Sequence, residues 1–285
     1  MIAGTMITIR EGLEAFLITG ILLGYLKKLD RRRDAPYVWA GTFAGIALSI
    51  ALALAFRALA IEFEEGPRAA LFELAASALA VPILSYMVLW MQRQARSIKA
   101  ELEMKAAAAI ATGQLLGLAF LAFITVLREG LETAVFLTAL TTRATGQNLM
   151  PGAMLGLLLA AGIAYLVFAT TVRLNLRTFF IVTGTLLIFI GAGLCGQIIM
   201  ALHELGFPAV HQPVWSTKWL LDSEGLPGRI LHAFIGYHDE PSLLEVLAYF
   251  GYLAGMGYAF FGAIRGTARR PEAAAEPVRA SANRS

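Results

Sequence analysis

The chain has 285 residues, of which 58% are hydrophobic and only 15% are charged, with a formal net charge of +3. An average soluble domain carries about 25% charged residues, so this composition excludes an ordinary soluble fold and favours an all-α helix bundle in a lipid bilayer. The positive charge does not indicate nucleic-acid binding, because the basic residues lie in short loops between apolar stretches. The single cysteine, Cys195, excludes an internal disulfide and a multi-cysteine metal site.

Apolar stretches long enough to cross a bilayer, which takes about 20 residues, recur along the whole chain. The first stretch begins at the N-terminus. No basic region precedes it and charged residues interrupt it, so it does not resemble a cleavable signal peptide. Seven transmembrane helices are expected, at 2–26, 37–60, 69–92, 113–141, 150–171, 178–202 and 243–265.

The loops between these helices predict their orientation, because cytoplasmic loops carry an excess of lysine and arginine. With seven spans, most of the basic residues lie on one side, in three loops and the C-terminal tail. The chain is then a protein of the cytoplasmic membrane with its N-terminus outside and its C-terminus inside. We expect a transmembrane domain over 1–266. The tail, 267–285, is rich in alanine, proline, glutamate and arginine and is expected to be disordered in the cytoplasm.

A charged pentapeptide, Arg-Glu-Gly-Leu-Glu, occurs twice inside these apolar stretches. One copy begins at Arg10 in the first span and the other at Arg128 in the fourth, 118 residues later. These two spans would cross the bilayer in opposite directions. We therefore expect the first three spans and the next three to form inverted repeats, with the last span added. Secondary transporters often follow this plan and bind their substrate near the midplane.

The two pentapeptides predict a buried cation site. Charge at membrane depth costs about 2.5–3.5 kcal/mol per residue, so these residues must be paired, turned inward or given a ligand. Each arginine can pair with one glutamate of its own motif, because residues four apart share a helix face, and one negative charge per motif is left over. Carboxylate oxygens suit hard and borderline cations. The candidate metal ligands are Glu11, Glu14, Glu129 and Glu132, with Arg10 and Arg128 as their charge partners. The alternative is that the ion pairs only lock the two helices together.

Other polar residues could extend this site. Glu73, near the outer start of the third span, would add a fifth metal-binding glutamate if it turns inward, and it would face water otherwise. Residues on the outer side could collect cations at an entrance, although a solvated loop and a structural histidine are the alternatives. These candidate entry residues are Glu62, Glu64, Glu65, His203 and Glu204.

Two such motifs in the first and fourth of seven spans resemble the oxidase-dependent iron transporter family. This iron/lead permease family includes the fungal high-affinity iron permeases and the bacterial EfeU-type iron permeases. Other segments carry the same likeness, which covers about residues 1–265. They are Phe72-Glu73 with 85–91, 201–205 with 213–215, and 236–237 with 241–246.

The resemblance implies an iron permease that imports ferric or ferrous iron across the cytoplasmic membrane and is not an enzyme. Iron is then the transported substrate, held by the four motif glutamates, and no cofactor is implied. Family members work with partners, so a separate ferroxidase or periplasmic iron-binding protein is expected. Some relatives are linked to lead uptake, which leaves lead or another cation as an alternative.

An intramembrane carboxylate–metal enzyme is the remaining alternative. Di-iron sites in helix bundles use glutamates together with a Glu-x-x-His motif. No expected span contains Glu-x-x-His, and His-Glu-x-x-His is absent from the sequence. The sequence therefore favours a transporter.

Overall fold

The computed structural model describes residues 2–62, 67–94, 98–111, 115–141, 149–169, 176–207, 213–219 and 235–282, with residues 225, 228 and 231. Over these residues the fold is all-α, as expected, and its only strand-like pairing is an isolated bridge between Pro213 and Ser242. The helices are α1 (Ile2–Lys28), α2 (Ala35–Glu62), α3 (Pro67–Gln94), α4 (Ile98–Ala111), α5 (Leu115–Thr141), α6 (Leu149–Ala169), α7 (Leu176–Glu204) and α9 (Leu243–Ala282), with a short 3-10 helix, η1 (Arg32–Asp34).

Five of these helices, α2, α3, α6, α7 and α9, are long and apolar enough to cross a membrane. The chain is therefore a multi-pass membrane protein. Helices α1 and α5 have 27 residues each, but each carries the three charges of a pentapeptide near its middle. Length and composition alone do not establish these two as spans, so the total of seven stays a prediction.

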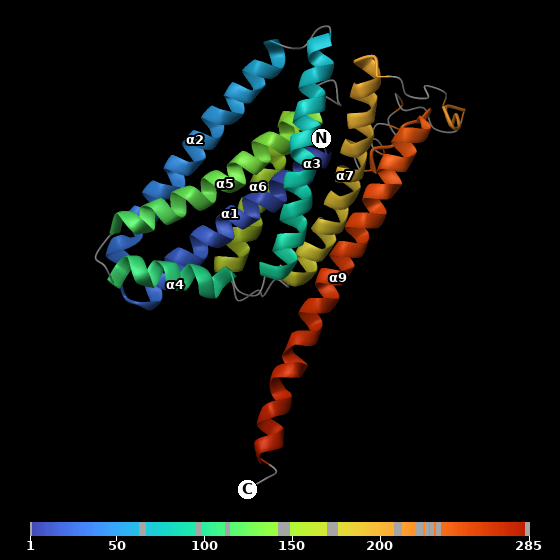
Figure 1. Ribbon diagram of the computed structural model, residues 1–285. Coiled ribbons are helices and arrows are strands. Elements are labelled where there is room, and N and C mark those ends of the chain that lie inside the picture. The colour runs from blue at the N-terminus through green and yellow to red at the C-terminus, as the bar shows by residue number, and fades with distance from the viewer. Residues whose placement is uncertain are drawn as a thin grey trace.

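Helix α4 lies where the sequence analysis expected only a loop. Its 14 residues are too few to cross a bilayer, and it packs against α1 and α5. Leu102 and Ala106 of α4 are buried in a cluster with Leu22 and Leu26 of α1. Figure 1 shows α4 lying across the end of the bundle where α1 ends and α5 begins.

Helix α9 also differs from the expectation of a disordered tail over 267–285. The helix continues to Ala282 and extends beyond the rest of the bundle (Figure 1). The added segment is rich in alanine, arginine and glutamate, which have high helix propensity, although it also contains Pro271 and Pro277, which do not.

Each of the helices α1, α2 and α3 packs mainly on a helix of the other half, α5, α6 and α7. Helix α1 packs mainly on α6, and α5 packs mainly on α2, while α3 packs on α7. Helices α1 and α5 also contact each other, and they run in opposite directions (Figure 1). If α1, α2 and α3 are exchanged with α5, α6 and α7, the contact between α1 and α6 becomes that between α5 and α2. The packing pattern is therefore the same for both halves.

Glycines at matching positions allow this close packing. Gly45 of α2 lies against the backbone oxygen of Phe123 in α5, and Gly156 of α6 lies against that of Thr5 in α1. Phe123 follows Thr5 by the same 118 residues that separate the two pentapeptides. Each glycine belongs to a Gly-x-x-x-Gly pair, which lets helix backbones approach each other in a membrane. Each helix that carries a pentapeptide is thus packed closely against a glycine-rich helix of the other half.

Candidate metal site

Three of the predicted glutamates converge inside the bundle. One carboxylate oxygen from each of Glu11, Glu14 and Glu129 lies within 4.8 Å of the other two. All three residues are buried, with exposed fractions of 1%, 2% and 3%. Glu11 and Glu14 share a face of α1 because they are three residues apart, and Glu129 joins them because α5 lies beside α1.

Arg10 lies between both glutamates of its own motif. Its Nη1 is 3.0 Å from Glu11 Oε1, and its Nη2 is 3.3 Å from Glu14 Oε1. Nη1 also lies 2.9 Å from the sulfur of Met87 on α3. The side chain of Arg10 is fully buried, so its charge is available only to this site.

Arg128 holds the same motif position but has different surroundings. Its Nε donates a hydrogen bond of 2.9 Å to Glu132 Oε1 and lies 3.7 Å from Glu129 Oε1. The guanidinium carbon lies 4.5 Å from the ring centroid of Trp90 on α3. The Arg128 side chain is 38% exposed. The arginine of the second motif is therefore paired mainly with one glutamate, and its side chain is partly exposed in a cavity.

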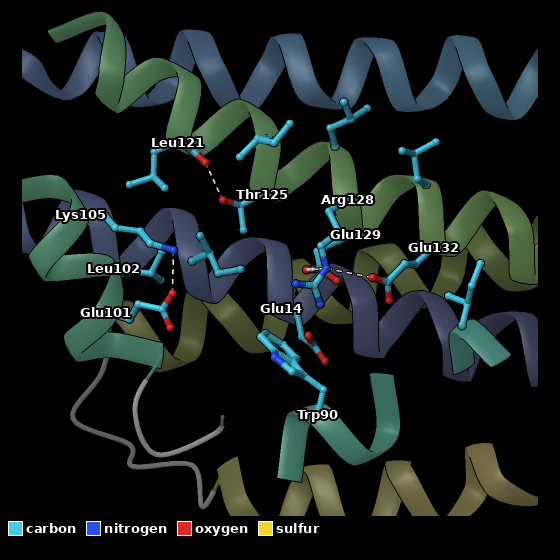
Figure 2. Close-up of a pocket in the computed structure, with 15 residues that line it drawn as sticks. Glu14, Trp90, Glu101, Leu102, Lys105, Leu121, Thr125, Arg128, Glu129 and Glu132 are labelled. Carbon is cyan, nitrogen blue, oxygen red and sulfur yellow. Dashed lines mark hydrogen bonds and ion pairs between the residues drawn. The ribbon is translucent and has the colours of Figure 1, made fainter. Parts of the chain in front are cut away.

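Glu132 is the one glutamate of the two motifs that does not join the group of three. Its side chain is 13% exposed and is held by Arg128. It lines the same cavity as Glu14 and Glu129 (Figure 2). The structure thus brings three of the four motif glutamates together and places the fourth beside them.

Several carboxylate oxygens of this site are buried without a hydrogen-bond donor among the described residues. They are Glu11 Oε2, Glu14 Oε1, Glu129 Oε2 and Glu132 Oε2, and of these Glu14 Oε1 lies 3.3 Å from Arg10 Nη2 in an ion pair. A buried carboxylate oxygen without a partner is costly, and such oxygens are rare in folded proteins. The site is therefore able to accept a cation or protons.

The glycine at the centre of each motif lies against the opposite half. A Cβ at Gly12 would lie 3.0 Å from the methyl carbon of Ala160 on α6, and a Cβ at Gly130 would overlap Ser49 of α2. Ala160 follows Gly156, and Ser49 follows Gly45, by four residues in each case. The central glycine of each motif therefore packs against the opposite half at an equivalent position, one helical turn after a glycine of that half.

A cavity of about 610 Å³ runs from the glutamates toward α4. Figure 2 shows Glu14, Arg128, Glu129, Glu132 and Trp90 at one part of it and Glu101 and Lys105 of α4 at another. The remaining lining residues are mostly apolar; they are Ile18, Ile83, Leu102, Leu121, Ile124, Thr125, Leu127 and Leu131.

The opposite side of the site is closed by apolar side chains. Ile7 of α1 precedes Glu11 by one helical turn, and Phe136 of α5 follows Glu132 by one turn. Both are buried in one cluster with Leu84 of α3 and Ile190 of α7. Glu14, Glu129 and Glu132 therefore line a cavity toward α4, Glu11 lies behind them without lining it, and a packed apolar layer lies in the other direction.

The other predicted site residues do not join the three glutamates. Glu73 of α3 accepts a hydrogen bond of 2.5 Å from Gln197 of α7 and does not line the cavity. At the end of α7, His203 is half-buried and Glu204 is exposed. Glu64 and Glu65 lie outside the described residues, as does the side chain of Glu62.

The structure adds three residues that the sequence analysis did not assign to the site. Trp90 of α3 lines the cavity and contacts Arg128. Glu101 and Lys105 of α4 form an ion pair of 2.6 Å. Their spacing of four residues is typical of a helix and is a sequence signal from which α4 could have been expected.

Comparisons with known proteins give a consistent result. The chain matches the model of the iron permease FTR1 family over residues 1–271. It is 35% identical over 258 residues to the ferrous iron permease EfeU of Escherichia coli O157:H7, covering 90% of this chain and 93% of that protein. It is 34% identical over 276 residues to the ferrous iron permease EfeU of Yersinia pestis, covering 96% and 98%. No solved structure gives a significant match.

Proposed function

Because the chain belongs to the iron permease FTR1 family, it is a membrane transporter rather than an enzyme, and we propose that it imports iron through the site of Glu11, Glu14 and Glu129. The observation that carries this proposal is the convergence of three buried carboxylates whose free oxygens have no donor among the described residues. A cation bound between them would offset their charge and satisfy those oxygens.

The transported ion in this proposal is Fe²⁺. Four motif glutamates and two motif arginines leave two net negative charges when all six are ionised. A divalent cation would neutralise these two charges. The relatives from Escherichia coli and Yersinia pestis are both named ferrous iron permeases. Carboxylate oxygens alone bind many divalent ions, so Pb²⁺ is a competitor that the experiment must include.

The proposed membrane arrangement has seven spans, with α1 and α5 as the two charged ones. Burial of their charges against each other lowers the cost of placing them in lipid. The exchangeable packing of the two halves and the matching glycines support an inverted repeat. The basic loops support a cytoplasmic position for the end of the bundle that carries α4, with the N-terminus outside.

The conformation then corresponds to a state that opens inward. The cavity leads from the glutamates to α4, and the apolar cluster around Ile7 and Phe136 closes the outer side. Opening that cluster while closing the cavity would expose the same glutamates to the outside. A separate oxidase or periplasmic binding protein would deliver iron to that outer face.

Purified protein in liposomes tests this proposal. A chelating dye inside the vesicles reports the entry of Fe²⁺ kept reduced by ascorbate, Fe³⁺ as its citrate, or Pb²⁺, and radiolabel retained in the vesicles reports the entry of the organic cation tetramethylammonium. We expect the wild-type protein to admit Fe²⁺ fastest. Glu129→Gln keeps the shape but removes a charge, so it should abolish uptake. Glu240→Gln, in an exposed ion pair with Lys218, is the matched control and should transport normally. Normal Fe²⁺ uptake by Glu129→Gln would refute the site assignment.

A further inference from the structure

The two motif arginines differ in how they divide their contacts. Arg10 lies 3.0 Å from Glu11 and 3.3 Å from Glu14. Arg128 lies 2.9 Å from Glu132 but 3.7 Å from Glu129, which is the equivalent of Glu11. Since the two pentapeptides are identical, this difference must come from the surrounding helices.

The neighbour on α3 differs between the two arginines. Arg10 is contacted by the sulfur of Met87, whereas Arg128 is placed over the indole ring of Trp90, 4.5 Å from its centroid. The face of a tryptophan ring attracts a guanidinium by its quadrupole. Trp90 lines the cavity, so this attraction draws Arg128 toward the cavity.

We propose that Trp90 is a positioning residue for ion transport, which holds Arg128 away from Glu129 and leaves that carboxylate directed at the ion shared with Glu11 and Glu14. The inference rests on the function proposed above. Without the ring, Arg128 would approach Glu129 as Arg10 approaches Glu11. A guanidinium at that distance competes with an incoming cation for the same carboxylate, because the attraction between charges rises as their distance falls.

A second tryptophan provides the contrast. Trp39 of α2 is 43% exposed and stacks on Phe43 of the same helix, with ring centroids 5.6 Å apart. It does not line the cavity and fits an interfacial anchor. Trp90 is half-buried and reaches an arginine on another helix. Substitution of Trp39 is therefore a control for the general effect of losing a tryptophan.

Initial rates of Fe²⁺ uptake into liposomes, measured over a range of Fe²⁺ concentrations, test the proposal. Trp90→Leu should raise the half-saturating concentration about fivefold, the effect of one cation–π contact, with little change in the maximal rate. Trp90→Phe restores a ring and should recover most of the affinity, and Trp39→Leu should match the wild type. If Trp90→Leu does not reach the membrane, Trp90→Met, which fills the space without a ring, carries the same expectation.

The role of Arg128 is tested by combining the changes. In an Arg128→Gln background, Trp90→Leu should produce no further rise in the half-saturating concentration, because the group that the ring positions is gone. An unchanged half-saturating concentration in Trp90→Leu, or an equal rise in the Arg128→Gln background, would overturn the proposal. Absence of Fe²⁺ uptake by the wild type would instead contradict the proposed function itself.

Discussion

Gly130 of α5 packs directly against Ser49 of α2, so closely that a methyl group at position 130 would overlap the serine side chain. The hydroxyl of Ser49 is itself fixed, since it donates a hydrogen bond of 2.8 Å to the backbone oxygen of Gly45. The equivalent contact, between Gly12 and Ala160, leaves slightly more room. These contacts set the distance between each charged helix and the glycine-rich helix that covers it.

Gly130→Ala should therefore destabilise the protein by about 1–3 kcal/mol, the usual cost of overpacking, and Gly12→Ala should cost less. Thermal unfolding in detergent measures both. Gly24→Ala is the control, because nothing lies near its added Cβ. Combining Gly130→Ala with Ser49→Gly should restore stability. Equal stability of the Gly130→Ala and Gly24→Ala proteins would show that this contact does not limit the packing.

Loss of the two arginines should have unequal effects on folding. Arg10→Gln leaves Glu11 and Glu14 buried without their cation, and breaking a buried ion pair costs about 3–5 kcal/mol. The Arg128 side chain is 38% exposed, so Arg128→Gln should affect folding less. The amount of protein in the membrane and its unfolding temperature measure the difference, with Arg68→Gln, an exposed arginine of α3, as the control. Similar losses for both variants would contradict the asymmetry.

The proposed inward-open state predicts which positions a water-soluble thiol reagent reaches. In a Cys195→Ala background, Thr125→Cys lies in the cavity wall and should react with a membrane-impermeant maleimide from the cytoplasmic side of inside-out vesicles. Ile7→Cys should not react from that side, since Ile7 is fully buried in the apolar cluster. Labelling of Thr125→Cys only from the outer side would reverse the orientation proposed here.

The segment before α9 should be stabilised more at low pH. His238 Nδ1 lies 3.0 Å from Glu245 Oε2. This hydrogen bond, followed by the charges of Glu245, Asp239 and Glu240, raises the pKa of His238 despite its partial burial. The protonated histidine thus stabilises the folded protein, and this contribution is lost as pH rises through the raised pKa.

Unfolding temperatures of the wild type and His238→Gln, measured from about pH 5 to about pH 9, test this expectation. The advantage of the wild type should be largest at the acidic end and should shrink as pH rises. Glu245→Gln should remove the same advantage. A wild-type advantage that grows with pH would contradict the assigned contact.

The sequence predicted the site because charge in an apolar helix has few explanations. The repeated pentapeptide predicts Glu11, Glu14, Glu129 and Glu132 as one site, and helical spacing accounts for the proximity of the first two; that Glu132 lies beside the group of three could not be predicted. The unequal surroundings of Arg10 and Arg128 could not be predicted, because both lie in identical pentapeptides and the difference comes from the helices packed around them. Trp90 and Met87 reach them from a helix whose rotation the sequence leaves open.

The apolar spans were predicted more readily than the parts outside them. Length and hydrophobicity identify α2, α3, α6, α7 and α9. Helix α4 was missed because its charged residues were assigned to a loop, and only the spacing of Glu101 and Lys105 indicates a helix. Glu73 was grouped with the motif glutamates by residue type, whereas its partner, Gln197, lies far away in the chain.

The packing of each half on the other also affects how the protein folds during its synthesis. Helix α1 leaves the ribosome first, yet the surface that covers it belongs to α6, which is synthesised more than a hundred residues later. Until then Arg10 and its neighbouring carboxylates lack Glu129 and the helices that bury them. The N-terminal half is therefore an incomplete folding unit that must wait in the bilayer, and a chain truncated after α3 should be a substrate for membrane quality-control proteases.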